Sequence, residues 1–313
     1  MADNDGQWER GLIERLAGAA LQEQRRARRL GIFFKLLTFA YITVIILMAM
    51  DWKGDGETSG KHTALVEVSG VIAPGTDASA ERIMAALQAA FKDKNTQGVV
   101  VRINSPGGSP VQSHNIYEEM RRLRKKHPDV PLYAVVEDLC ASGGYYVAAG
   151  ADRIYVGRSS IVGSIGVRMD SFGLTGLMEK LGVERRLLTA GDNKGFLDPF
   201  LPVDATQKAH AQALLEDVHR QFIGAVRDGR GSRLKETPDM FSGLVWTGQK
   251  SVELGLADAY GSLDSVAREV VKAEKVVDFS QKENLAEKFA RRLGAGAASV
   301  VLEFALRGVA QPR

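Results

Sequence analysis

The sequence predicts an α/β fold built on a mainly parallel sheet. Short runs rich in β-branched residues alternate with helical stretches through the middle of the chain, and this alternation is typical of βαβ units. Glycine- and serine-rich turns follow two of the strand-like runs, at 104–108 and 142–144. Sites form at the C-terminal ends of parallel strands, so we expect both turns to lie at one site.

Six runs have the β-branched and aromatic content that is typical of strands. They cover residues 64–72, 98–103, 132–136, 153–156, 163–167 and 184–189. Between them, apolar residues recur at helical spacing, as at Ile83, Leu87 and Phe91. The predicted helices cover 78–91, 112–125, 142–149, 173–181, 204–227, 247–255 and 262–275. We expect the 173–181 helix to cover the sheet.

Capping and turn residues mark several of these boundaries. His127-Pro128 ends the second helix, because the residue before a proline disfavours the helical region. Asp204 and Gln207 have the spacing of a capping box at the start of the longest helix. Thr247 is placed to cap the helix that follows.

The N-terminal region predicts a membrane anchor. Residues 32–50 are apolar apart from Lys35 and two threonines, and their helical length of about 28 Å is close to the thickness of a bilayer. The cluster Arg25–Arg29 should stay in the cytoplasm. A cleaved signal peptide is an alternative, but residues 47–51 offer no small-x-small cleavage site. A buried core helix fits poorly between a charged cluster and a polar linker.

Composition and residue spacing weaken several function classes. A net charge of +3 gives no argument for a nucleic-acid partner. The single cysteine, Cys140, excludes an intrachain disulfide. His210 and His219 lack the spacing of a helical metal pair, and no histidine stands in a glycine-rich block. We therefore expect no metal, no cofactor and no histidine base.

Ser142 stands at the junction between a strand and an alanine-rich helix, followed by Gly143 and Gly144. A serine in this position has its Oγ above the end of the sheet, as in a nucleophile elbow, although the sequence does not match the G-x-S-x-G motif. The alternative is a serine N-cap whose glycines allow close packing. Cys140 is a less suitable nucleophile, because no local cation stabilises a thiolate.

Two further stretches bear on the chemistry. Gly107 and Gly108 follow a strand-like run. In one interpretation their backbone N–H groups stabilise an oxyanion; in the other, a Pro-Gly turn closes the strand and has no catalytic role. Lys194 lies among small and turn-forming residues. A lysine acts as a general base only if its surroundings keep the amine neutral, and a solvated surface lysine is the alternative.

Together these stretches resemble the bacterial signal peptide peptidase A family, membrane-anchored Ser-Lys serine proteases with a Clp-protease/crotonase-like fold of repeated ββα units. The resemblance covers about 65–271. The matching blocks are Asn104–Gly108, Ala141–Tyr146, Gly163–Val167, Gly191–Lys194 with Asp198–Phe200, and Trp246–Gly248 with Gly255–Asp258.

The resemblance implies a role for each matching residue. Ser142 would be the nucleophile and Lys194 the base. Gly107, Gly108 and Gly143 would form the oxyanion hole, and Ser164 would orient the lysine. It also implies remnant signal peptides and other apolar peptides as substrates, and a homo-oligomeric ring.

The predicted organisation has five parts. They are a cytoplasmic tail (1–31), a transmembrane helix (32–50), a linker (51–62), a peptidase domain (63–275) and a C-terminal helical extension (276–313). The chain would cross the inner membrane once, with its catalytic domain outside the cytoplasm. Two other functions stay open: a crotonase-like acyl-CoA enzyme, and an inactive membrane-anchored scaffold.

Overall fold

The computed structural model describes residues 24–26, 28–44 and 60–281, which belong to two separate units. In the first unit, residues 28–44 are helical and their side chains are almost all exposed. Within the described residues, no helix combines the length and the apolar character that crossing a membrane requires. Residues 45–50 of the predicted span, most of the predicted linker and residues 282–313 lie outside the described residues.

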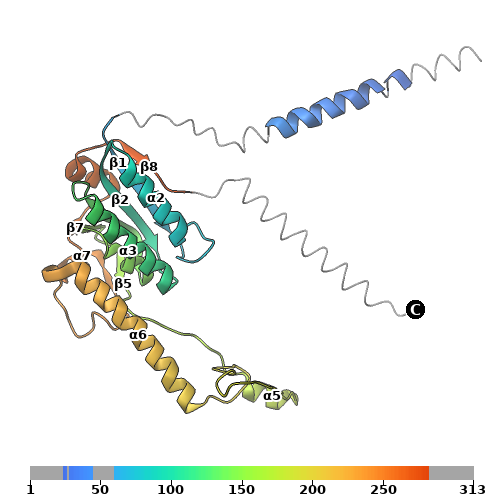
Figure 1. Cartoon of the computed structure of the whole chain (residues 1–313), viewed down its shortest axis with the longest axis vertical. Coiled ribbons are helices and arrows are strands. Elements are labelled where there is room, and N and C mark those ends of the chain that lie inside the picture. The colour runs from blue at the N-terminus through green and yellow to red at the C-terminus, as the bar shows by residue number, and fades with distance from the viewer. Residues whose placement is uncertain (1–23, 27, 45–59, 282–313) are drawn as a thin grey trace, which may run out of the picture. The chain divides into compact units, whose positions relative to one another are not determined.

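The second unit contains a mainly parallel sheet, which confirms the predicted fold class (Figure 1). Its main path runs in the order β6-β5-β3-β2-β1-β8, while β4 pairs with β3 and with β7. All pairs are parallel except β5 with β6. The strands are β1 (His62–Ser69), β2 (Thr96–Ser105), β3 (Leu132–Ala141), β4 (Arg153–Val156), β5 (Ile161–Gly163), β6 (Val245–Thr247), β7 (Ala259–Tyr260) and β8 (Val276–Asp278).

Helices cover both faces of this sheet because successive side chains of each strand point to opposite faces. On one face, Val101 and Ala134 belong to a large apolar core with α2 (Ala80–Lys92), α3 (Pro110–Lys126) and α4 (Gly143–Ala148). On the other face, Val100 and Val135 pack against a short helical stretch. That stretch consists of α8 (Leu263–Ser265) and the π-helix η2 (Val266–Val271).

Strand β3 changes partners along its length, and this change positions the candidate nucleophile. Residues 133–136 pair with β4, whereas 139–141 pair with β5. Glu137 and Asp138 lie exposed at the change of partner. The strand then ends directly at Ser142, beside the C-terminal end of β2, where Ser105 pairs with Cys140.

The long helix α6 (Ala205–Arg230) joins the large apolar core through its C-terminal half. Phe222 and Val226 are buried in the core, whereas the N-terminal half is largely exposed. Asp204 caps this helix by accepting a hydrogen bond from the Gln207 N–H at 2.9 Å, as the capping pattern predicts. Thr247 likewise caps α7 (Gly248–Glu253).

Three sequence predictions are wrong in the region between β5 and α6. The strand predicted over 163–167 is β5, which ends at Gly163, so Ser164 follows the strand. Residues 184–189 form no strand and are mostly exposed. Helix α5 (Thr175–Leu181) has no buried residue and does not cover the sheet. Strand β8 also extends the sheet to Asp278, beyond the start of the predicted C-terminal extension.

A buried ion pair ties the end of α6 to β4. The Arg230 guanidinium, fully buried, donates to Asp258 Oδ2 at 2.8 Å and to the Gly255 carbonyl at 2.8 Å. The same Oδ2 accepts from the Ile154 N–H at 2.7 Å. Burial alone would raise the pKa of Asp258, but the hydrogen bond and charge of Arg230, the Ile154 N–H and the charge of Arg233 together hold this pKa below its usual range.

We expect Asp258→Asn to lower the free energy of unfolding at pH 7 by about 3 kcal/mol, because Arg230 would stay buried without its counter-charge. Because the pKa of Asp258 is lower in the folded than in the unfolded state, its ionisation stabilises the wild-type fold at pH values above the ordinary aspartate pKa. This stabilisation is lost as the pH falls through the folded-state pKa. Denaturant titrations should therefore show the gap to wild type narrowing below about pH 4. The control is Asp264→Asn at an exposed site. A difference in the free energy of unfolding between Asp258→Asn and wild type that does not change with pH would contradict the proposed role of the ion pair.

Candidate active site

The backbone at Ser142 has the strained geometry of a nucleophile elbow. Its φ of 52° and ψ of −123° are uncommon for a residue with a side chain, and such strain is often found at active sites. The Ser142 N–H donates to the Gly163 carbonyl at 2.8 Å, and its carbonyl accepts from the Tyr146 N–H at 3.0 Å. These bonds hold the residue between β3 and α4, and its side chain makes no cap hydrogen bond. Ser142 thus occupies the N-cap position of α4, but its Oγ does not cap the helix.

The loop after β2 supplies backbone donors beside the elbow. Gly108 forms a bridge with Ile72, in which the Ile72 N–H donates to the Gly107 carbonyl at 2.9 Å and the Ser109 N–H donates to the Ile72 carbonyl at 2.8 Å. The Gly107 N–H donates to Ser105 Oγ at 3.1 Å. Within residues 60–281, no acceptor bonds the N–H of Gly108 or of Gly143.

Close packing brings these two unbonded N–H groups together. A Cβ on Gly107 would lie 2.7 Å from both Gly143 N and Ser142 Cβ. A Cβ on Gly143 would lie 3.2 Å from Gly108 N. Two adjacent free N–H groups beside a serine Oγ suit an oxyanion hole. Gly108 and Gly143 are thus the available donors, whereas Gly107 allows the close approach.

Ser105 is a residue of this site whose role the sequence pattern did not indicate. Its fully buried hydroxyl donates to the Gly70 carbonyl at 2.6 Å and accepts from the Gly107 N–H. One side chain therefore connects the turn after β1 with the oxyanion loop. The position of Ser105 directly before Pro106-Gly107 was a sequence signal for a role in this loop. Nothing in the sequence indicated that its partner would be the distant Gly70.

A cavity of about 730 Å³ lies in front of Ser142. Ser164 lines it, just past the end of β5, with its N–H donating to the Leu244 carbonyl at 2.7 Å. Part of the wall is apolar and comes from Val71, Tyr146, Val218 and Phe222. An extended peptide with an apolar side chain would fit such a wall. Gly107, Gly108 and Gly143 line the same cavity.

Tyr146 connects this cavity to the helices around it. Its ring stacks on Phe222 with centroids 4.8 Å apart, and its hydroxyl lies 3.0 Å from His114 Nδ1. Desolvation by burial raises the pKa of Tyr146 to about 12, so the phenol stays neutral. From the sequence spacing, His114 was predicted to be an isolated residue on a helix.

Lys194 is not among the residues that line the cavity. It is exposed in a turn of the 171–203 segment, and the ring of Phe196 in that segment packs on His210 near the start of α6. Phe222, which reaches the cavity, lies twelve helical positions further along α6, about 18 Å along its axis. The structure of one chain therefore does not bring Lys194 to Ser142.

Cys140 does not compete with Ser142 as a nucleophile. Its side chain is fully buried, and desolvation raises the pKa of the thiol well above its usual range. A thiol that stays protonated is a poor nucleophile.

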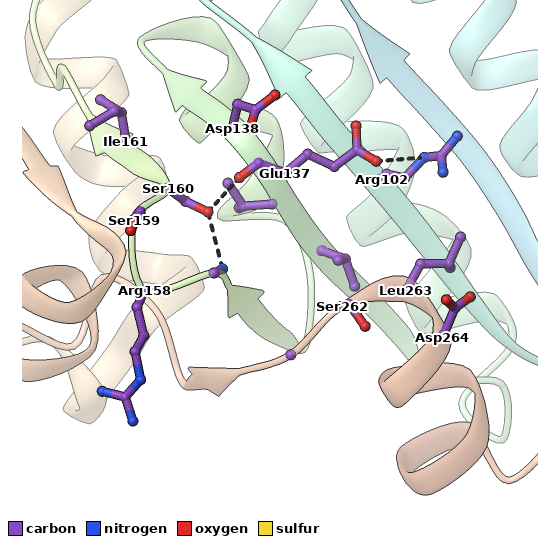
Figure 2. A pocket seen from close by; sticks show the side chains of 14 residues that line it. Arg102, Glu137, Asp138, Arg158, Ser159, Ser160, Ile161, Ser262, Leu263 and Asp264 are labelled. Carbon is purple, nitrogen blue, oxygen red and sulfur yellow. Dashed lines mark hydrogen bonds and ion pairs between the residues drawn. The ribbon is translucent and has the colours of Figure 1, made fainter.

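A second cavity, of about 720 Å³, lies on the other side of β3 and contains none of the candidate catalytic residues (Figure 2). Glu137 and Asp138 line it at the change of partner in β3, and Arg102 forms an ion pair with Glu137 at 3.5 Å. Ser160 Oγ donates to the Glu137 carbonyl and accepts from the Gly157 N–H. In the described part of the chain, no group of three or more acidic, histidine or cysteine side chains is arranged to hold a metal.

Comparison with known families places both halves of this site in peptidase families. The model of Peptidase family S49 matches residues 124–277, which include Ser142 and Lys194. The model of Clp protease matches residues 65–161, which include Gly107, Gly108 and again Ser142.

Several curated relatives also align with this chain. A Synechocystis sp. protein that carries the name of a protease is 34% identical over 202 residues, covering 64% of this chain and 70% of that protein. The chloroplastic serine protease SPPA of Arabidopsis thaliana is 28% identical over 245 residues, covering 74% of this chain and 35% of that protein. The Na(+)/H(+) antiporter NhaA of Brucella abortus is 47% identical over 182 residues, which are 58% of this chain and 25% of that protein. The chain thus spans a quarter of that relative.

We expect Ser105→Ala to slow the reaction of Ser142 with a fluorophosphonate about tenfold or more, because the oxyanion donors lose their support. The free energy of unfolding should fall by about 1–3 kcal/mol, since the Gly107 N–H loses its acceptor. Labelling kinetics and denaturant titrations measure the two effects. Ser69→Ala, at an exposed position of β1, is the control and should change neither. A variant that is less stable but labels at the wild-type rate would restrict Ser105 to a role in folding.

We expect Cys140→Ala to keep its labelling rate within about twofold of wild type, because the buried thiol supplies no thiolate. Ser142→Ala should not label at all. Mass spectrometry of the labelled peptide checks both outcomes. Loss of labelling in a folded Cys140→Ala variant would remove Ser142 as the assigned nucleophile.

Proposed function

The chain belongs to peptidase family S49, and on that premise we propose that it is a serine endopeptidase with a Ser142-Lys194 dyad. The observation that carries this proposal is the strained elbow at Ser142, with the unbonded N–H groups of Gly108 and Gly143 beside it. That arrangement suits acyl transfer, in which a hydroxyl attacks a carbonyl and a negative oxygen develops.

The proposed reaction proceeds through an acyl-enzyme. The neutral amine of Lys194 takes the proton from Ser142 Oγ as the oxygen attacks the substrate carbonyl. The tetrahedral oxyanion accepts hydrogen bonds from Gly108 and Gly143, and the intermediate collapses as Lys194 returns the proton to the leaving amine. Water then attacks the ester by the same route in reverse, which releases the acid and restores Ser142. Ser164 is proposed to orient the lysine amine.

We propose that Lys194 reaches Ser142 from a second copy of the chain. The separation along α6 and the exposure of Lys194 support this arrangement. The segment that carries Lys194 also exposes large apolar side chains, including Phe172 at 80% and Leu188 at 97%. Apolar surface of this kind favours an interface with another subunit. Repetition of one such head-to-tail contact forms a ring when the rotation between subunits closes, and a ring is the proposed assembly.

The proposed substrates are apolar peptides, including remnants of signal peptides. The apolar part of the cavity wall, near Tyr146 and Phe222, supports this class. Residues 32–50 are proposed as a single membrane anchor in the inner membrane, with the N-terminus in the cytoplasm and the catalytic domain outside it. No nucleic-acid partner and no cofactor are proposed.

Mixing two inactive variants tests the dyad and its arrangement together. Ser142→Ala and Lys194→Ala should each be inactive alone. A randomly mixed ring should regain about a quarter of the wild-type peptide turnover, because that fraction of sites combines an intact serine with a neighbour's intact lysine. Turnover of an apolar fluorogenic peptide by the full chain in detergent provides the measurement. Lys194→Arg is the matched control and should be inactive alone, since a guanidinium does not deprotonate.

Two results would count against these proposals. If the mixture stays inactive while mixed rings form, the dyad lies within one chain. If Lys194→Arg turns over peptide near the wild-type rate, Lys194 is not the base.

A further inference from the structure

Exposed basic side chains gather at the end of the sheet where β1 begins. The parallel strands start at this end, and the connecting helices return their C-termini to it (Figure 1). The His62 N–H donates to the Asn95 carbonyl at 3.1 Å, and the rings of Phe91 and His127 lie 5.6 Å apart, so the ends of α2 and α3 meet the start of β1. We call this surface the basic end; its residues are Lys61, Lys92, Lys94, Lys125, Lys126, Arg153 and Lys272.

Within residues 60–281, acidic side chains balance the charge of the basic end only in part. Arg124 is the neighbouring cation that is neutralised, because its Nε donates to Asp152 Oδ2 at 2.7 Å. Near the basic end, the remaining acidic side chains are fewer than the basic ones: Asp93, Asp129 and Glu274. The opposite end of the strands has mixed charge, because Glu137, Asp138 and Asp264 line the second cavity there together with Arg102 and Arg158 (Figure 2).

We propose that the basic end docks on anionic lipid headgroups and so holds the catalytic domain against the bilayer. This inference rests on the proposed membrane anchor. An anchor that ends at Met50 is separated from Lys61 by a segment that spans at most about 38 Å when fully extended. The chain enters the domain at the basic end itself, so the segment from the proposed anchor joins this end of the domain and not the opposite end.

The chemistry of the basic end suits a lipid surface. Lysine ammonium groups are compact, strongly hydrated charges that bind without a fixed geometry, and each one near an anionic leaflet adds to the attraction. Salt screens such an attraction, because it acts between exposed charges across water. Docking by this surface should therefore need anionic lipid and should weaken as the ionic strength rises.

Lysine footprinting of the full chain in lipid vesicles tests the proposal. The vesicles contain phosphatidylcholine alone or with phosphatidylglycerol, and an amine-reactive reagent modifies exposed lysines, which mass spectrometry quantifies. We expect Lys94 and Lys125 to react about fivefold more slowly in the anionic vesicles at low salt. The difference should vanish at about 1 M salt, where the Debye length is about 3 Å. Lys250, at the opposite end, should react equally in both vesicles.

A matched pair of variants separates this surface from net charge. Lys61→Glu/Lys94→Glu should abolish the protection of Lys125, whereas Arg158→Glu/Lys250→Glu changes the net charge equally at the opposite end and should preserve it. Equal reactivity of Lys94 in the two vesicles, or protection of Lys125 that survives the first variant, would overturn the proposal. Resistance to alkaline carbonate extraction reports separately on the anchor, so loss of the anchor and loss of docking give different results.

Discussion

The active-site geometry depends on the close approach of two backbone segments, the loop at Gly107-Gly108 and the elbow at Ser142. A Cβ on Gly107 would lie 2.7 Å from Gly143 N, a separation that real Cβ atoms essentially never show. The bridge from Gly108 to Ile72 and the Ser105 hydroxyl hold the loop from behind. Because the N–H groups of Gly107 and Ser109 are both bonded and Pro106 has none, the fold itself leaves Gly108 as the donor of this loop that can face a substrate.

The change of partner in β3 supplies the second half of this geometry. The strand pairs first with β4 and then with β5, so residues 137–138 have no partner strand on that edge of β3. One consequence is the charged cavity of Figure 2. The other is that β5 ends beside Ser142, where the Gly163 carbonyl accepts the serine N–H and Ser164 reaches the catalytic cavity.

Sequence patterns predicted the core of the fold and the backbone turn at Ser142 because both are encoded locally. Buried strands and amphipathic helices repeat their apolar residues at a fixed period, and the Ser142 elbow is contiguous in sequence. The 184–189 segment is apolar in part but has no neighbouring strand, and a strand exists only through pairing. Ser105 and Gly70 are far apart in sequence, so their hydrogen bond left no local pattern. The position of Lys194 depends on α6, whose N-terminal half makes few contacts with the core.

The direction of the strands sets a condition on any substrate that comes from the bilayer. From Leu132 to Ala141, β3 rises about 30 Å at roughly 3.3 Å per residue, and Ser142 follows its far end. With the basic end on the headgroups, Ser142 would face away from the bilayer at about that height. An apolar peptide embedded in the membrane would then have to extend about nine residues out of it to reach the oxyanion donors. Peptides already released, or held extended by neighbouring subunits that also supply Lys194, would meet this condition most readily.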